Sequence, residues 1–198
     1  MISLGVTGGI GSGKSFVSRL LEEEYAIPVY NCDIRARIIT QCDTNVKEQL
    51  TALMPYLYDE ENVLDKNRLA QYLFASEANA RRVNNIIHPV VRADLRQWIV
   101  DHSDALIVAV ESAILYESGF HTEVDRVLFV DAPLEIRLQR VETRDGLSPD
   151  EVIRRMKSQR PDVARGRADF CIMNDGRSDL ISQLRETLET LNPKIIKS

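Results

Sequence analysis

GVTGGIGSGKSF, residues 5–16, contains five glycines, and four of them lie between a short apolar segment and a helix-forming segment. The residues ISLGVT at 2–7 are typical of a buried strand, and SFVSRLLEEEY from Ser15 puts Val17, Leu20 and Leu21 on one helical stripe. When a strand, a glycine loop and a helix follow one another, backbone N–H groups and the helix N-terminus form an anion site. The stretch therefore predicts an α/β fold with an anion site after its first strand.

The segment GGIGSGKS at 8–15 fits the pattern GxxxxGK[ST]. Its glycines let the chain curl so that successive N–H groups point at the β- and γ-phosphates of a nucleotide. Lys14 would add positive charge there, and the Ser15 hydroxyl is placed to coordinate Mg²⁺. We therefore predict an ATP or GTP site formed by Gly8, Gly9, Gly11, Ser12, Gly13, Lys14, Ser15 and Phe16.

Two other interpretations of these glycines are weaker. A purely structural turn has no use for Lys14 followed by Ser15. A dinucleotide-binding fingerprint could use Gly9, Gly11 and an acid at Asp33, but its third glycine would fall at Lys14, where a long side chain blocks close helix–sheet packing. Among nucleotide-binding proteins, the chain lacks the guanine-reading NKxD segment of GTPases and is short for a motor or transporter. Small-molecule phosphoryl transfer fits best.

Composition and charge narrow the class of protein further. The chain has 198 residues, 44% of them hydrophobic, and a formal net charge of −5, which suits one globular domain and argues against nucleic-acid binding. Residues 137–167 hold nine Lys/Arg and five Asp/Glu, as expected of either an anion-binding segment or a solvated, salt-bridged surface. No apolar run approaches the roughly 18 residues of a membrane span, and a secretory signal is missing, so we expect a cytoplasmic protein. The separated Cys32, Cys42 and Cys171 indicate reduced thiols.

Uninterrupted apolar runs at 2–7, 27–31, 106–112, 126–132 and 169–174 predict a five-stranded parallel sheet flanked by helices. We assign the nucleotide-binding core of this α/β fold, of the P-loop class, to residues 1–34 and 102–198. The stretch between the second and third runs, 35–101, reads as a helical insertion.

Helical spacing identifies several of the connecting helices. Within 77–101, Val83, Ile87, Val90 and Trp98 recur at helical spacing, and Pro89 should kink or split that helix. A helix over 134–144 would carry Leu134, Leu138 and Val141 inward, and the residues SPDE from Ser148 predict the start of another.

Two acids stand at predicted strand ends. Asp33 follows the second strand by two residues, at the sheet edge where the P-loop opens. It could take the proton of an attacking hydroxyl, or it could cap the following helix, and position alone leaves both readings open. Glu111, at the end of the third strand, resembles the acid that holds the magnesium shell in P-loop proteins, with helix capping as the alternative.

Three arginines share one face of the predicted helix over 134–144. Arg137, Arg140 and Arg144 are spaced by three and four residues. A helical lid over about 137–165 that carries them could close on the nucleotide, neutralise the charge of the moving phosphoryl group and exclude water.

The chain resembles the dephospho-CoA kinase family nearly from end to end. The resemblance rests on VTGGIGSGKS (6–15), CDIRAR (32–37), NIIHPVVR (85–92), ILYESG (114–119), RLQRVETRDGLS (137–148) and ADFCIMNDG (168–176). Many families share the first motif, whereas the IIHPVVR, LYESG and RxxxRDG segments in this order are much more specific.

The resemblance implies transfer of the ATP γ-phosphate to the ribose 3′-hydroxyl of dephospho-CoA, giving CoA and ADP, with Mg²⁺ as cofactor. By this likeness Asp33 is the catalytic base and contacts the acceptor. Lys14 and Arg140 stabilise the transferred phosphoryl group, and Arg140 also contacts the acceptor. Arg144 assists on the lid, and Asn174 approaches the adenine of ATP.

The resemblance also implies that the helices over 35–101, with His88, form the part of the protein that binds dephospho-CoA, although His88 before Pro89 could be a packing residue instead.

The chain departs from the family in two places. It reads Asn31-Cys32-Asp33 where the family usually has Asp-Ala-Asp, and ESAILYE from Glu111 where the family has an acid followed by Pro-Leu-Leu-Phe-Glu. The side chain of Glu111 is one methylene longer than the aspartate that is usual at this place in the family.

Two rival functions share the P-loop. A kinase for another small acceptor, such as a nucleoside monophosphate, differs only in how it binds that acceptor. A nucleotide-dependent switch would have no use for a base at Asp33, which favours a kinase, and an inactive descendant is disfavoured because every motif position is filled. We expect only small-molecule substrates as partners, no nucleic acid or membrane, and a monomer or weak homo-oligomer.

Overall fold

The computed structural model describes residues 1–145 and 161–195, which form two compact units. We call Met1–Asn31 with Ile99–Ser198 the core unit, and Cys32–Trp98 the helical unit. The first boundary falls after Asn31, three residues before the end of the predicted core segment 1–34, because helix α2 (Cys32–Cys42) begins directly where strand β2 (Val29–Asn31) ends.

The core unit contains a five-stranded parallel sheet in the order β2-β3-β1-β4-β5, so the predicted sheet is confirmed. The other strands are β1 (Ile2–Thr7), β3 (Ile107–Glu111), β4 (Arg126–Asp131) and β5 (Phe170–Met173). β1 is the central strand, and the register pairs Glu111 with Val6 on one side and with Asn31 on the other. The carboxyl ends of β1, β2 and β3 therefore meet at one edge of the sheet.

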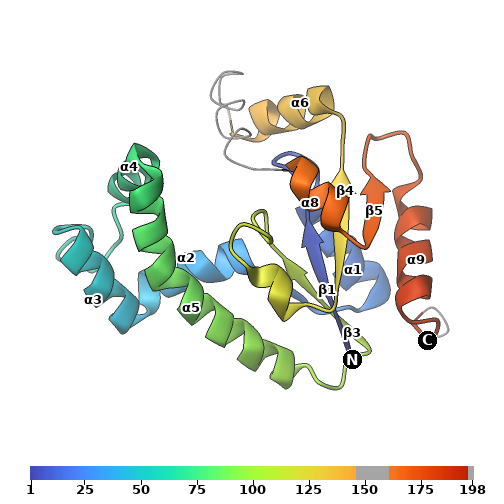
Figure 1. Cartoon of the computed structure of the whole chain (residues 1–198), viewed down its shortest axis with the longest axis horizontal. Coiled ribbons are helices and arrows are strands. Elements are labelled where there is room, and N and C mark those ends of the chain that lie inside the picture. The colour runs from blue at the N-terminus through green and yellow to red at the C-terminus, as the bar shows by residue number, and fades with distance from the viewer. Residues whose placement is uncertain (146–160, 196–198) are drawn as a thin grey trace. The chain divides into compact units, whose positions relative to one another are not determined.

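Helices cover both faces of this sheet (Figure 1). On one face, α1 (Lys14–Tyr25) and α9 (Leu180–Leu191) pack against alternate residues of the strands. The buried cluster includes Val17 and Leu21 of α1, Leu184 of α9, Leu4 of β1 and Leu128 of β4. On the other face, α8 (Pro161–Arg167) and the segment with the short helix η1 (Phe120–Glu123) lie in front of the strands in Figure 1.

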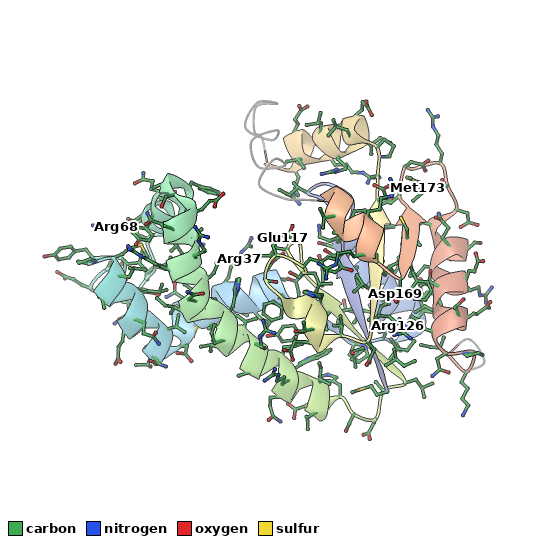
Figure 2. The ribbon with its side chains drawn as sticks, viewed as in Figure 1. Arg37, Arg68, Glu117, Arg126, Asp169 and Met173 are labelled. Atoms are coloured by element: carbon green, nitrogen blue, oxygen red, sulfur yellow. The ribbon has the colours of Figure 1, made fainter. Side chains whose placement is uncertain are left out.

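An ion pair joins the beginnings of β4 and β5 (Figure 2). Arg126 Nε lies 3.7 Å from Asp169 Oδ1, and Asp169 Oδ2 accepts a 2.8 Å hydrogen bond from the Val127 N–H. The pair is exposed, so its electrostatic contribution to stability is small, and the hydrogen bond to the strand backbone supports the register.

The helical unit holds α2, α3 (Thr44–Leu53), α4 (Lys66–Ala75) and most of α5 (Glu77–Asp101). Asp43 caps α3 by accepting from the Val46 N–H, and Asp65 caps α4 by accepting from the N–H groups of Asn67 and Arg68. α2 is tied to α5 by Arg35, whose Nη2 and Nε donate to the two carboxylate oxygens of Asp94 at 2.6 and 2.9 Å.

Pro89 does not split α5, contrary to that part of the expectation, because the helix runs unbroken for 25 residues. Its buried side chains are Val83, Ile87, Val91 and Leu95. They are spaced by four, so Val91 and not Val90 continues the stripe. Burial on both sides of Pro89 holds the helix together, while the proline itself lies on the exposed side.

Helix α6 (Leu134–Asp145) confirms the predicted helix at 134–144 but not all of its inward face. Val141 is buried, with Leu138 and Ile10 packed against it, whereas Leu134 is 52% exposed. Leu134 is the first residue of the helix and lies nearly two turns from Val141, which explains why it stays outside this cluster. The helix predicted from Ser148 lies outside the described residues.

Across residues 1–145 and 161–195, we find no helix with the length and apolar character that a membrane span requires.

Replacing Pro89 with Ala should raise the free energy of unfolding by about 1–3 kcal/mol, because an alanine restores the missing N–H donor to the Asn85 carbonyl. Urea unfolding followed by far-UV circular dichroism measures the change. Arg82→Ala, at an exposed position of the same helix, is the matched control and should shift stability by less than about 0.5 kcal/mol. A less stable P89A protein would show that the proline ring contributes packing that outweighs the lost hydrogen bond.

Candidate active site

The glycine loop joins the end of β1 to the beginning of α1 at the centre of the sheet edge. Gly13 is the N-cap of α1 and has φ 93° and ψ 26°, a left-handed conformation that side chains disfavour. A Cβ added there would also collide with the Asn174 amide nitrogen. Glycine is therefore required at this position, and the N-terminus of α1 opens directly onto the loop.

Side chains from within the loop and from β5 hold the loop carbonyls. The Lys14 ammonium is buried and donates to the carbonyls of Gly8 and Gly9 at 2.9 and 3.3 Å. The Asn174 amide, just beyond β5, donates to the Ser12 carbonyl at 2.8 Å. These bonds turn the carbonyl groups toward the protein.

Two arginines of α6 complete this set of contacts. Arg137 Nε donates to the Ile10 carbonyl at 2.9 Å. Arg140 Nη1 lies 3.5 Å from the Gly11 carbonyl and 3.3 Å from that of Ser12, and its Nη2 donates to Asn174 Oδ1 at 3.3 Å. With Lys14 and Asn174, these arginines supply a side-chain hydrogen bond to every carbonyl from Gly8 to Ser12.

The N–H groups of the loop are arranged differently. Within the described parts of the chain, those of Gly9, Gly11, Gly13 and Ser15 donate to no acceptor. The Ser12 hydroxyl is also buried without a partner among the described residues. Unpaired donors at a helix N-terminus suit the oxygens of a phosphate chain. The N–H of Phe16, predicted here as well, donates to the Gly13 carbonyl in the first turn of α1, and the residue is 47% exposed.

Glu111 lies beside the loop, at the end of β3, and is 4% exposed. Its Oε1 accepts from the Ser15 hydroxyl at 2.8 Å, and its Oε2 accepts from the Asn31 amide at 2.9 Å. The helix-capping alternative for Glu111 is wrong, because the carboxylate binds these side chains and a turn segment, not an α-helix, follows β3. The carboxylate and the hydroxyl are hard oxygen ligands in contact with one another.

This pair fits a magnesium ion. The described residues contain no group of three or more His, Cys, Asp or Glu that could hold a metal by themselves. Mg²⁺ in phosphoryl-transfer sites usually takes only one or two protein oxygens and completes its shell with phosphate oxygens and water. Ser15 and Glu111 provide such a partial set of ligands next to the loop.

Asp33 and His88 belong to the helical unit. Asp33 is the second residue of α2, inside its first turn, so it does not occupy the N-cap position that the alternative interpretation required. His88 lies on α5, where burial and the positive charge of Arg92 both lower the pKa of the imidazole, which is therefore neutral at pH 7. Arg144 is exposed in the last turn of α6, one turn beyond Arg140.

The structure adds two residues that the sequence analysis did not assign to the site. Arg137 was placed on the arginine face but was given no separate role, although its spacing from Arg140 already indicated one. Asn31 was noted only as a departure from an acid, and the bond to Glu111 becomes visible only when β2 and β3 are paired. Glu117 (Figure 2) lines a small cavity together with Thr7, Gly8 and Gly9.

Comparisons with known proteins agree with this geometry. The dephospho-CoA kinase family profile matches residues 2–179. The chain is 44% identical to a Bacteroides fragilis dephospho-CoA kinase, covering 98% of this chain and 95% of that protein. It is 40% identical to one from Porphyromonas gingivalis, covering 98% and 96%.

Among solved structures, a Thermus thermophilus protein superposes with a TM-score of 0.82 at 32% identity, covering 98% of this chain and 97% of the other. The fold class and the family predicted from the sequence are confirmed. The phosphate-binding loop, the oxygen ligands beside it and the arginines over it are the parts that ATP-dependent phosphoryl transfer needs. The chain belongs to the dephospho-CoA kinase family.

Proposed function

We propose that this chain transfers the γ-phosphate of ATP to the ribose 3′-hydroxyl of dephospho-CoA, giving CoA and ADP, with Asp33 as the general base. The Asp33 carboxylate would take the proton of the 3′-hydroxyl as its oxygen attacks the γ-phosphorus, and ADP would leave with the electrons of the broken P–O bond. Family membership supports the choice of acceptor, and the position of Asp33 after β2 supports its role.

The observation that carries the proposal is the arrangement of the loop from Gly8 to Ser12. All its carbonyls are bonded to side chains, while N–H groups of the same loop are left for a ligand. Such fixed donors stabilise charge that develops on a phosphoryl group without having to reorganise during the reaction. Lys14 and Arg140, already at the loop, would balance the negative charge of the transferred group.

Ser15 and Glu111 would hold Mg²⁺, whose chemistry when bound is to neutralise charge on the β- and γ-phosphates. Asn31 would keep the Glu111 carboxylate in place through its amide hydrogen bond. Because Asn31 is neutral where the family usually has an acid, no second negative charge lies beside the Glu111 carboxylate at this position.

Other assignments follow from the family. Residues 1–34 and 102–198 would bind the nucleotide, and the insertion over 35–101, with His88, would bind the acceptor. The proposed lid over about 137–165, of which residues 146–160 lie outside the described parts of the chain, would bring Arg144 to the phosphates. Asn174 would approach the adenine while its side chain holds the loop. We further propose a cytoplasmic location and a monomer or weak homo-oligomer, with ATP and dephospho-CoA as the only partners.

The first test is ADP release with Mg-ATP in the presence of dephospho-CoA, AMP, other nucleoside monophosphates or no acceptor, followed by separation of the products. We expect turnover that depends on dephospho-CoA and yields CoA. Turnover only with another acceptor would show that the chain is a kinase but that dephospho-CoA is not its substrate. Slow ADP release that is the same with every acceptor and without one would indicate a nucleotide-dependent switch protein.

Asp33→Asn should lower kcat by about 10²–10⁴-fold, because an amide cannot accept the proton of the attacking hydroxyl. ATP binding, measured by calorimetry, should not change. Asp104→Asn removes an exposed carboxylate elsewhere and should leave kcat as it is. Wild-type turnover by D33N would show that another group, or no base, serves the reaction.

Glu111→Gln should raise the Mg²⁺ concentration needed for half-maximal activity, because a neutral amide is a weaker metal ligand than a carboxylate. The Mg²⁺-dependent gain in ATP affinity, measured by calorimetry without acceptor, should shrink in parallel. Glu23→Gln, at an exposed position of α1, is the matched control. If E111Q keeps the full Mg²⁺-dependent gain in ATP affinity, the metal is held without Glu111.

A further inference from the structure

The helical unit contains an open, mostly apolar pocket of about 730 Å³ between α2 and α4. The lining residues on which the argument depends are Ala36, Arg37 and Thr40 of α2 and Leu69, Ala70 and Leu73 of α4. All of them belong to Cys32–Trp98, so the pocket is a property of this unit alone. Its volume is in the range of small-molecule sites.

Helix α4 has an apolar face but no fully buried residue. Leu69 and Leu73 are half-buried over the pocket, and Phe74 at its edge is 76% exposed. A soluble helix normally buries such a face against its neighbour. The half-open face of α4 therefore offers apolar surface to a ligand that enters beside α2.

Two cations line the pocket, and none of the described lining residues carries a carboxylate. Arg35 is used within the fold by its bidentate pair with Asp94. Arg37 (Figure 2) and Lys66, in contrast, form no ion pair or side-chain hydrogen bond with the described parts of the chain. The pocket thus combines apolar walls with positive charge at its edge, which suits a ligand with an anionic group and an apolar portion.

The pocket begins on the face of α2 that carries Asp33. Residues 33, 36, 37 and 40 are spaced i, i+3, i+4 and i+7, so they share one side of the helix. With a rise of about 1.5 Å per residue, Arg37 lies about 6 Å and Thr40 about 10 Å along the helix from Asp33. Along this face the Asp33 carboxylate comes first, followed by Arg37 and the other residues of α2 that line the pocket.

That order matches the chemical order of dephospho-CoA, in which the ribose is followed by a diphosphate and then by the pantetheine arm, with its gem-dimethyl group and two amides. On the basis of the proposed function, we propose that the pocket between α2 and α4 binds the pantetheine arm, with Arg37 contacting the diphosphate while Asp33 faces the ribose. In this arrangement, one side of α2 contacts the ribose, the diphosphate and the pantetheine arm of the acceptor in turn. An acceptor without the arm, such as AMP, would lack most of these contacts.

Filling the pocket tests the assignment directly. Ala70→Phe places a ring between α2 and α4, and Ala75→Phe places the same ring at an exposed position outside the pocket, which makes it a matched control. A70F should raise KM for dephospho-CoA about tenfold and change KM for ATP by less than about twofold, whereas A75F should change neither. Pantetheine 4′-phosphate, which has the arm without adenosine, should compete with dephospho-CoA in wild type and A75F but not in A70F.

Removing the charge is a second, independent test that leaves the packing of the fold unchanged. Arg37→Gln should raise KM for dephospho-CoA about tenfold and flatten its dependence on salt, because a charge-assisted contact to the diphosphate is lost. Arg68→Gln, on α4 outside the pocket, is the matched control (Figure 2).

The outcomes separate the two proposals. If the wild type makes CoA and both A70F and R37Q keep its KM for dephospho-CoA, the pocket assignment is overturned and the function stands. A change of oligomeric state in A70F but not in A75F, with KM unchanged, would likewise overturn it and assign the groove to a contact between copies. If the wild type makes no CoA, the proposed function fails and this assignment fails with it.

Discussion

The site depends above all on the hydrogen bonds that hold the carbonyl groups of the glycine loop. Backbone carbonyls that pointed into the loop would repel a phosphate chain, so a phosphate site requires them to be satisfied elsewhere. Lys14, Arg137, Arg140 and Asn174 meet this requirement, and they come from α1, α6 and the end of β5. Three regions that are distant in sequence therefore stabilise the same short turn. The glycines allow the backbone to adopt this turn, and the hydrogen bonds from these side chains stabilise it over other loop conformations.

The parallel register of the sheet accounts for the second part of the site. Because β2 and β3 end together, the Asn31 amide and the Glu111 carboxylate meet, and the Ser15 hydroxyl joins them from the first turn of α1. The two departures from the usual family sequence thus lie in contact with one another. A longer acid and a neutral neighbour form one hydrogen-bonded unit, which explains how both differences can occur in the same chain while each oxygen of the buried carboxylate has a hydrogen-bond donor.

In the helical unit, one helix has two uses that depend on its periodicity. One face of α2 carries Asp33 and the pocket-lining residues Ala36, Arg37 and Thr40, while Arg35 binds Asp94 of α5 and fixes the helix. The bidentate pair stabilises the position of the helix without using the cations at the pocket. The arginine that holds the fold, Arg35, and the arginine proposed to contact the ligand, Arg37, are therefore only two residues apart, and the helical repeat places them on different sides of α2.

Much of this protein could be predicted from local sequence. Apolar runs identified all five strands, the P-loop pattern identified the phosphate site, and the family motifs identified Asp33 and Arg140 as candidates, because each of these signals is contained in a few adjacent residues. Pro89 shows the limit of that approach: a local rule allowed the helix to be split there, but the buried stripe on both sides of the proline keeps the helix continuous. Asn31 shows another, because its partner Glu111 is 80 residues away. The strands, the loop and the family were thus predictable from the sequence. The side chains that hold the loop, the partner of Glu111 and the pocket beside α4 became known from the folded chain, because those contacts join residues that are far apart in the sequence.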